Sequence, residues 1–409
     1  MIVRAAIAAF LLASSHGGGQ APALRERFHG GGQALALRGQ GSAAASALPE
    51  CAAAPWPHWS RYVQAFVSSD GRVIDRTGHD RTTSEGQAYA LFFAVVANDP
   101  ALFGRVVRWT EENLARGDLT HRLPAWAWGR RSDGSWGILD ANSASDADLW
   151  LAYALLEAGR LWSERRYDAL ARSVLSNVAA REVASLPALG PTLLPGASGF
   201  TVEDGRGWRL NPSYVPPQVL RRAASAQPDG PWRKVLASSI RTVRESAPRG
   251  VVADWVLYSR RGFSADPVKG RVGSYDAIRV YLWLGMVPRG DPARRDLDPA
   301  TSGPLRLLAE RGALPEEIDA GSLRGKGEAP VGFYAALLPL AASGDPASAA
   351  RLETRLSAAL KDGLYGSPPA YYDQNLILFA RGFVEGRFGF AADGQLAPAW
   401  EKTCDTTQR

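Results

Sequence analysis

The stretch Ala144–Trp162, which reads ASDADLWLAYALLEAGRLW, decides the fold class of this chain. Small and apolar residues recur along it at the spacing of one helix face, namely Ala152, Leu155, Leu156 and Gly159. Ser145 stands before the acids Asp146 and Asp148, and serine followed by acids is typical of a helix N-terminus. The stretch therefore predicts a helix whose first turn carries two carboxylates.

Two other stretches share this design. Ser84 and Glu85 come before a helical run that ends near Val96, and Ser274-Tyr275-Asp276 comes before a third run that ends near Gly285. For any one of these stretches alone, helix capping explains both the serine and the acid. Helix capping alone is a weaker explanation when three helices repeat the same arrangement.

The spacing of the acids points to a shared location. Asp146 lies 61 residues after Glu85 (146 − 85), and Asp276 lies 130 residues after Asp146 (276 − 146), which are about one and two helical hairpins. Residues that are whole hairpins apart in a ring of hairpins return to the same rim, so we expect these three carboxylates at one mouth. Asp373 lies a further 97 residues along (373 − 276), which fits no whole number, and this prediction leaves it out.

Further helical patterns fill the rest of the chain, and Gly/Pro clusters separate them. They cover residues 101–115, 165–183, 218–226, 231–246, 303–311, 332–342, 346–360 and 373–385. Alternating strand patterns are scarce, with short strands expected only around Gly71–Val73 and Gly199–Val202. We therefore expect an all-α fold with minor short strands, in a single domain at 51–409. A simple helical bundle of this length would need an unusually broad core. Six hairpins of about 59 residues, arranged in a ring, would account for the length and avoid such a core.

Composition excludes some classes of protein. The chain has 409 residues, 46% of them hydrophobic and 22% charged, which excludes global disorder. Its net charge of +6 (47 − 41) is too weak to indicate nucleic-acid binding. Among the domain's His and Cys residues, no spacing is typical of a metal site, and there is no phosphate-binding GxxxxGK[ST] loop. We expect no nucleic-acid partner and no metal or nucleotide cofactor, with calcium left open because its oxygen ligands leave little sequence trace.

The first 50 residues predict a leader. Met1–Ser15 has an early Arg4 and a nine-residue apolar run, which suits an export signal and is too short to span a bilayer. Residues 16–48 are low in complexity and contain a near duplication. A buried or disordered N-terminus is the alternative. We expect a periplasmic or secreted protein after signal cleavage, with no stable membrane span.

Export would place the two cysteines where disulfides persist. Cys51 and Cys404 allow a single intramolecular pairing, which would close a loop of about 350 residues. On the loop-entropy account this bond would stabilise the fold by ~4–5 kcal/mol. We predict this disulfide, and two free thiols remain the alternative.

Paired carboxylates without metal ligands suit glycoside hydrolysis. One carboxyl must be protonated to help the leaving oxygen depart, and the other must be ionised to activate water or attack the sugar. A helix N-terminus favours the ionised form, which suits a base and opposes an acid. Aromatic residues in nearby Gly/Pro-rich segments would supply flat surfaces for sugar rings.

The same residues resemble glycoside hydrolase family eight, and within it the periplasmic endoglucanases encoded with bacterial cellulose synthases. Ala144–Trp162 follows the family signature nearly throughout, with Leu151 in place of the usual Ile or Met. The resemblance runs from Cys51 to Cys404. Further matching stretches are TSEGQ at 83–87, LPAWAWG at 123–129, NSASD at 142–146, WRLNPSY at 208–214, SYDAIRVY at 274–281, 327–332 and LAPAW at 396–400.

The resemblance implies an (α/α)6 barrel and hydrolysis of β-1,4-glucan with inversion. It implies that Glu85 is the general acid and Asp276 the general base, and that Asp146 binds and distorts the sugar beside the cleaved bond. Inversion requires the two catalytic carboxyls to stand roughly 6.5–9.5 Å apart. The remaining positions implied for substrate binding are Asp148, which would share or support the role of Asp146, Tyr275 and Arg279 beside the base, and the sugar platforms Trp128, Tyr214 and Tyr372.

Two other functions stay open from the sequence. A polysaccharide lyase or phosphorylase also fits a helical barrel, and a lyase would leave an unsaturated product that absorbs in the ultraviolet. A cellulose-binding export or scaffold protein would keep the groove without the reaction. The expected partner is a β-1,4-glucan chain. Contact with the cellulose synthase complex, and a role in cellulose synthesis and export, are expectations from the resemblance alone.

Overall fold

The computed structural model describes residues 53–202 and 206–402, all of which belong to one compact unit, Cys51–Arg409. The predicted leader at 1–50 and the predicted disulfide partners Cys51 and Cys404 lie outside the described residues. The domain boundary and the disulfide therefore stay predictions.

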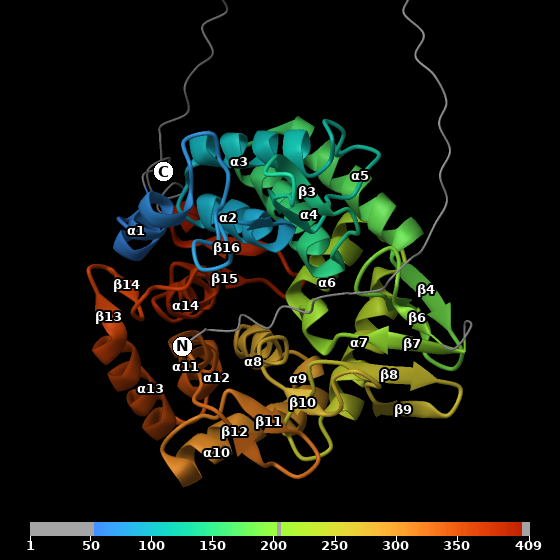
Figure 1. The fold of residues 1–409 in the computed structure, drawn as a ribbon, viewed down its shortest axis with the longest axis vertical. Helices are drawn as coiled ribbons and strands as arrows, with labels where there is room; N and C mark the ends of the chain where they lie inside the picture. Colours follow the sequence, from blue (N-terminus) through green and yellow to red (C-terminus); the bar gives the residue numbers. More distant parts are fainter. Residues whose placement is uncertain (1–52, 203–205, 403–409) are drawn as a thin grey trace, which may run out of the picture. The chain divides into compact units, whose positions relative to one another are not determined.

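Within this unit the helices form two concentric rings (Figure 1). Each helix or helix pair of the inner ring contacts the next, and α14 contacts α2 to close the ring. The inner ring is α2 (Ser84–Val96), α4 (Ser145–Leu161), α6 (Pro217–Ala226), α8 (Ile278–Gly285), α11 (Val331–Ala336) with α12 (Leu338–Ala342), and α14 (Tyr371–Val384). The outer ring is α3 (Pro100–Asn113), α5 (Arg165–Arg181), α7 (Trp232–Ser246), α9 (Ala293–Thr301) with α10 (Gly303–Arg311), α13 (Pro346–Ala359) and α1 (Pro57–Phe66).

Burial distinguishes the two rings. In α2 every residue except Glu85 is buried, and in α4 burial runs without a break from Ser145 to Ala158. The outer helix α5 instead buries one face, formed by Tyr167, Ala171, Val174, Leu175 and Val178. A helix that is apolar all round must lie inside, and a helix with one apolar stripe must lie outside. Fully buried inner helices surrounded by outer helices with one buried face form the predicted (α/α)6 barrel.

An aromatic layer fills the inside of the barrel. The ring of Phe379 on α14 lies 5.0 Å from those of Tyr89 and Phe92, 5.1 Å from that of Trp150 and 5.2 Å from that of Trp283. These rings come from α2, α4, α8 and α14 and are almost fully buried. The barrel interior is therefore a packed core and not a channel.

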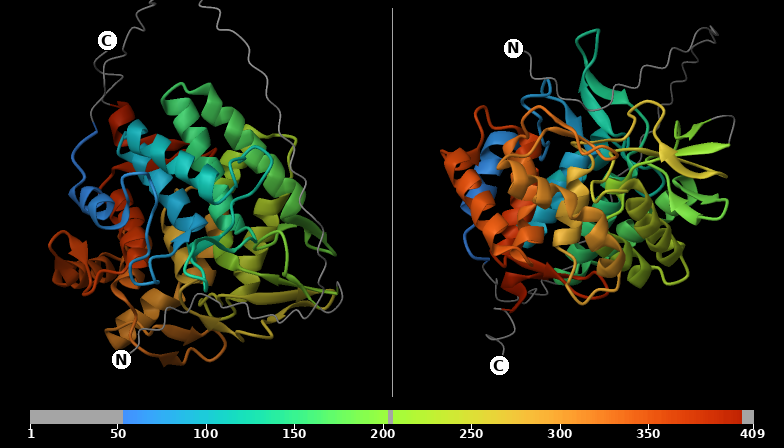
Figure 2. Two further views of the ribbon diagram at one scale, coloured as in Figure 1. Left: turned by 45° about the horizontal axis from the view of Figure 1, so that its top comes forward. Right: turned by 90° about the horizontal axis from the view of Figure 1, so that it is seen from below.

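Short strands occupy the connections between helices (Figure 2). Two sheets have three strands, β1 (Thr82–Thr83), β2 (Ala127–Arg130), β3 (Trp136–Asp140) and β10 (Val272–Gly273), β11 (Glu317–Asp319), β12 (Gly325–Lys326). One sheet has four, β6 (Thr201–Val202), β7 (Gly207–Leu210), β8 (Val256–Ser259), β9 (Gly262–Ala265). The two-stranded sheets are β4 (Val183–Leu186) with β5 (Gly190–Leu193), β13 (Leu360–Lys361) with β14 (Leu364–Tyr365), and β15 (Phe388–Phe390) with β16 (Leu396–Pro398).

The sequence prediction found the helices better than the strands. Every predicted helical stretch overlaps a helix, with 332–342 divided between α11 and α12. Strand structure occurs at both predicted places, as an isolated bridge between Val67 and Val73 and as β6. The prediction lacked α1 and α9, and α9 carries Pro299 inside it, which obscures a helical pattern.

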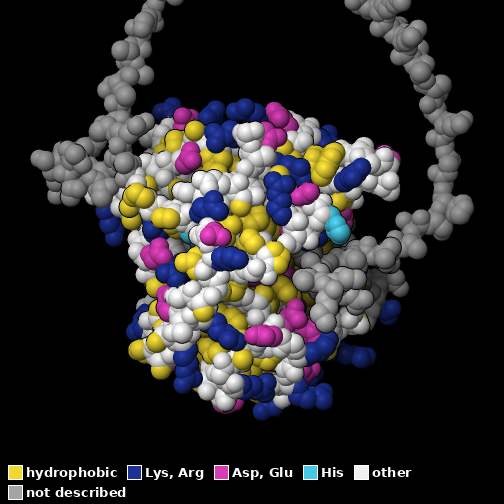
Figure 3. Space-filling view, turned by 60° about the vertical axis from the view of Figure 1, so that its left-hand side comes forward, with side chains coloured by type: hydrophobic (Ala, Val, Ile, Leu, Met, Phe, Trp, Pro, Cys, Tyr) yellow, Lys and Arg dark blue, Asp and Glu magenta, His cyan; other side chains and the backbone are white. Residues whose placement is uncertain are grey.

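Charge is spread over the surface that can be seen. Figure 3 shows Lys and Arg side chains dispersed among uncharged and apolar ones on the visible face. The net charge of +6 is thus not gathered into one basic patch on that face. Within the described part of the chain, no helix combines the length and the apolar character needed to cross a membrane.

Candidate active site

Three carboxylates predicted to share one mouth meet at the guanidinium of Arg279. Arg279 Nη1 donates to Glu85 Oε1 and, over 2.8 Å, to Asp146 Oδ2. Its Nη2 donates to Asp276 Oδ1 over 2.8 Å and to Ser213 Oγ over 3.0 Å. The acids come from three segments that are far apart in the sequence, so the ring of helices brings them together.

Arg279 is a buried charge that its neighbours compensate. Its side chain is 4% exposed, and it stands one turn after Asp276 at the start of α8. Burial lowers the pKa of Arg279, but Glu85 and the other acidic neighbours raise it by more in total, so the pKa lies well above its ordinary value. A buried cation needs such partners, because removing it from water costs several kcal/mol. The pairing holds all three acids at fixed positions.

Glu85 is positioned by its own helix. The hydroxyl of Tyr89, one turn later in α2, donates to Glu85 Oε1 over 3.1 Å. Thr83 caps the helix by accepting the Gly86 N–H over 3.1 Å. The Glu85 side chain is 16% exposed, and it is the one residue of α2 that is not buried. Glu85 therefore has a defined orientation and an open side.

Asp146 is more deeply placed, with a side chain that is 5% exposed. Burial raises its pKa to about 7; Arg279 opposes this shift and the charge of Glu85 adds to it. The peptide N–H of Ala147 donates to Asp146 Oδ1 over 2.8 Å. Burial is therefore the main influence on this carboxyl, and it favours the neutral form.

Asp276 is held by two donors. Its Oδ1 accepts from Arg279, and its Oδ2 accepts from the indole N–H of Trp255 over 3.0 Å. With 28% of its side chain exposed, Asp276 is the most open of the three acids. Both of its oxygens are thus oriented while the carboxylate keeps access to solvent.

Asp254 fixes the turn that carries Asp276. Its Oδ1 accepts the backbone N–H of Ser274 over 2.7 Å and that of Ala277 over 2.8 Å. Burial, followed by the charge of Asp276, raises the pKa of Asp254 to about 7. The sequence prediction missed both Asp254 and Trp255. The available signal was an acid inside the apolar run VVADWV at 251–256.

Asp148 lies behind the site. Both of its carboxyl oxygens are buried, and they face Glu182, whose Oε1 accepts from Ser143 Oγ over 2.5 Å. Burial raises the pKa of Asp148 well above its usual range and that of Glu182 to about 8. Two acids that face each other are most stable when they share one proton. Asp148 has no exposed surface, and its predicted role in substrate binding stays a prediction; Glu182 was not predicted.

Three of the predicted aromatic residues surround the Arg279 cluster. The Arg279 guanidinium lies 5.4 Å from the ring centre of Tyr214. The hydroxyl of Tyr372 donates to the backbone carbonyl of Tyr275 over 2.5 Å, and the hydroxyl of Tyr275 donates to Glu316 over 2.7 Å. All three predicted rings are half-buried. Trp128 lies on β2, away from the contacts of Arg279, and opposite Thr82 of β1.

The cluster is not arranged as a metal site. Arg279 occupies the position between the acids where a cation would bind. Among residues 53–202 and 206–402, no group of three or more His, Cys, Asp or Glu side chains is placed to hold a metal ion.

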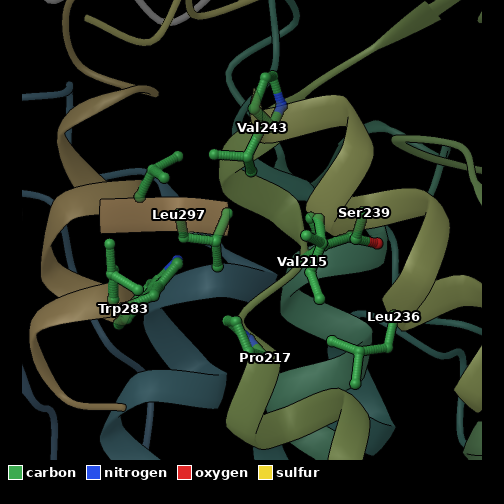
Figure 4. Close-up of a pocket in the computed structure, with 11 residues that line it drawn as sticks. Val215, Pro217, Leu236, Ser239, Val243, Trp283 and Leu297 are labelled. Atoms are coloured by element: carbon green, nitrogen blue, oxygen red, sulfur yellow. The ribbon is translucent and has the colours of Figure 1, made fainter. Parts of the chain in front are cut away.

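A cavity elsewhere in the barrel belongs to helix packing. Figure 4 shows it between side chains of α7, α8 and α9, among them Val243, Trp283 and Leu297. Its lining is almost entirely apolar and includes no carboxylate. It is therefore a gap between the inner and outer rings rather than part of the acidic cluster.

Comparison with known proteins identifies the family. The model of glycosyl hydrolases family 8 matches residues 38–386. The chain belongs to glycosyl hydrolase family 8. The resemblance seen in the sequence motifs is thus confirmed: the protein is a glycoside hydrolase, and its (α/α)6 barrel is the fold of family 8.

Relatives and solved structures agree with this assignment to family 8. An endoglucanase of Xanthomonas axonopodis pv. citri is 51% identical over 361 residues, which cover 88% of this chain and 92% of the relative. An endoglucanase of Escherichia coli K12 is 40% identical over 355 residues, covering 86% and 94%. The crystal structure of an endo-1,4-D-glucanase from Vibrio fischeri ES114 superposes with a TM-score of 0.80 at 40% identity, covering 85% of this chain and all of that one.

Proposed function

We propose that this family 8 hydrolase is an endo-β-1,4-glucanase that cleaves cellulose chains with inversion. The observation that carries the proposal is that Glu85 and Asp276 form ion pairs with different nitrogens of the buried Arg279 guanidinium. Each of these two acids keeps an exposed part, whereas Asp146 is nearly buried. Two oriented carboxylates with separate access suit a reaction that needs one acid and one base.

Glu85 acts as the general acid in this proposal. It gives its proton to the oxygen of the glycosidic bond as that bond breaks, so the leaving sugar departs as a neutral alcohol. Arg279 and the first turn of α2 hold the Glu85 carboxyl in place, and a bound glucan would expel water from around it. Tyr89 keeps the carboxyl oriented toward the bond.

Asp276 acts as the general base. Its hydrogen bonds from Arg279 and Trp255 orient both oxygens, and its exposed side leaves room for a water molecule. The water attacks the anomeric carbon from the face opposite the leaving oxygen while Asp276 takes its proton. One proton leaves Glu85 and one arrives at Asp276, and the anomeric configuration inverts. We expect the two carboxyls to stand roughly 6.5–9.5 Å apart in the working complex.

Asp146 and the aromatic residues are proposed to bind the sugar chain. Asp146 shares Arg279 Nη1 with Glu85, and its charge acts on the buried pair Asp148 and Glu182, which suits it to holding and distorting the sugar beside the cleaved bond. Tyr214, Tyr275 and Tyr372, together with Trp128 on β2, would supply flat surfaces for other sugar rings. The proposed polymer follows from relatives named endoglucanases and from the endo-1,4-D-glucanase of Vibrio fischeri.

We further propose that the protein is exported and acts on cellulose during its synthesis and export. The predicted signal at Met1–Ser15 and the motif resemblance described above support this role. The predicted Cys51–Cys404 disulfide fits the same compartment, and the cellulose synthase complex is the proposed partner. Cell fractionation tests the location: the protein should be recovered from the periplasm or medium without its leader. Full-length protein confined to the cytoplasm would contradict export.

Hydrolysis assays test the proposed enzyme directly. Wild type should release reducing ends from a soluble cellulose derivative, and Glu85→Gln and Asp276→Asn should each reduce turnover by roughly 10²–10⁴-fold. Glu112→Gln, an exposed acid on outer helix α3, is the matched control and should keep full activity. Equal release by wild type and Glu85→Gln would refute the acid. An ultraviolet-absorbing product would instead indicate a lyase, and binding without any release would indicate a scaffold protein.

A further inference from the structure

The hairpin formed by β2 and β3 carries an exposed aromatic surface outside the Arg279 cluster. Trp136 is 45% exposed and Leu139 is 47% exposed, which is unusual for large hydrophobic residues in this chain. Its ring lies 5.3 Å from that of Trp128, with an angle of 22° between the two planes. In the right-hand view of Figure 2, this hairpin extends away from the helices. A tryptophan in this position contributes little to the barrel core.

Neighbouring residues hold the two rings in place. The guanidinium of Arg72 lies 4.5 Å from the ring centre of Trp128 and 4.7 Å from that of Trp136. Arg72 itself donates to Thr82 Oγ1 over 2.9 Å and to the carbonyl of Asp80. An aromatic surface that is already ordered loses little conformational entropy when a ligand stacks on it. The arrangement is therefore prepared for binding before a ligand arrives.

Backbone pairing links the hairpin to the start of α2. Strand β1 pairs Thr82 with Trp128, and the N–H of Ser84 donates to the carbonyl of Trp126 over 3.0 Å. Glu85 follows Ser84 directly in the chain. One small sheet thus connects the paired tryptophans to the residue next to the proposed general acid.

A sugar ring matches this surface chemically. A pyranose ring has an apolar face of C–H groups and a rim of hydroxyls, which suits a flat indole bordered by hydrogen-bonding side chains. We propose that Trp136, supported by Trp128 and Arg72, forms an outlying subsite for a glucosyl unit of the same β-glucan chain that lies between Glu85 and Asp276. This subsite rests on the proposed function, and it makes long chains better substrates than short ones.

Chain-length dependence tests the subsite. Trp136→Ala should lower kcat/KM by roughly three- to tenfold on a soluble cellulose derivative. Across cello-oligosaccharides of three to six units, the loss should grow with chain length and be smallest on the shortest one that is cleaved. Leu139→Ala is the matched control, because Leu139 has 47% exposure on the same strand and stands three residues after Trp136, so its side chain faces the opposite side of β3. It should leave kcat/KM unchanged on every substrate.

The outcomes separate the subsite from the proposed function. A loss in Trp136→Ala that is equal at all lengths, or no loss at any length, would overturn the subsite while wild-type activity upholds the glucanase. Loss in both variants would point to damage of the hairpin and would also overturn it. Wild type that cleaves no β-1,4-glucan would instead refute the proposed function. Thermal melting of both variants checks that the barrel remains folded.

Discussion

Two regions one helical turn apart differ in almost every physical property. At the mouth, Arg279 holds Glu85, Asp146 and Asp276, and part of the cluster faces solvent. Directly below, aromatic rings from the same helices pack around Phe379 with no exposed surface. Tyr89 belongs to both regions, since its hydroxyl contacts Glu85 and its ring lies 5.0 Å from that of Phe379.

The difference shows how the fold divides two tasks. The aromatic layer fixes the inner helices and closes the barrel, so substrate approaches the acids from the mouth alone. The mouth gives up apolar packing and concentrates buried charge, which contributes weakly to stability but sets the orientation of the reacting groups. Changes in the layer should therefore alter stability, and changes at the mouth should alter reaction rate.

The largest stability effect should come from emptying the layer. Phe379→Ala removes a fully buried ring that contacts five others, so the free energy of unfolding should fall by about 3–5 kcal/mol. Denaturant unfolding measures this loss, and turnover per folded molecule should change little. Glu85→Gln is the opposite control: turnover should be lost, and because Asp146 and Asp276 still compensate Arg279, unfolding should change less than in Phe379→Ala. Parallel loss of stability and turnover in both variants would break the comparison.

A smaller effect should appear as a pH dependence of stability, to which buried carboxyls at and around the mouth contribute. Burial raises the pKa of Asp146, Asp254 and Asp373 to about 7 and that of Glu182 to about 8. These values lie above those of the unfolded chain, so the neutral carboxyls favour the fold fully below about pH 4, and this contribution is lost as pH rises through 7 to 8. The free energy of unfolding should therefore fall between pH 5 and pH 8.

One variant isolates part of this pH dependence. Asp373 at the start of α14 makes no contact with Arg279, and Asp373→Asn should reduce the slope by up to about 1.4 kcal/mol per pH unit. Unfolding in denaturant at pH 5.0, 6.5 and 8.0 measures the slope. Phe379→Ala should keep the wild-type slope at a lower stability. Stability that rises with pH in wild type would contradict the burial of these carboxyls.

Asp373 also shows where sequence reasoning stopped. Its spacing of 97 residues from Asp276 led to its omission from the mouth, yet it lies in the first turn of an inner helix. The spacing rule assumes equal hairpins, and the segment between α8 and α14 contains the short helices α9, α10, α11 and α12. The rule succeeded for Glu85, Asp146 and Asp276 because the hairpins between them are more regular.

Helices and acids were predictable because their signals are local. The pattern at Ala144–Trp162 contains both the apolar faces and the acids of the first turn, so it predicts α4 and its role together. Asp254, Trp255 and Glu182 were not predictable in this way. Each lies in a loop or turn and contacts a site residue 20 or more residues away, so the contact becomes visible only in the folded chain.

The anomeric form of the first product tests the central claim most directly. Proton NMR during early hydrolysis of a soluble β-1,4-glucan distinguishes the α-anomer from the β-anomer before they equilibrate. Glu85 as acid and Asp276 as base, with water between base and sugar, predict the α-anomer as the first product. The β-anomer as the first product would show retention, and the assignment of Asp276 as a base that activates water would be wrong.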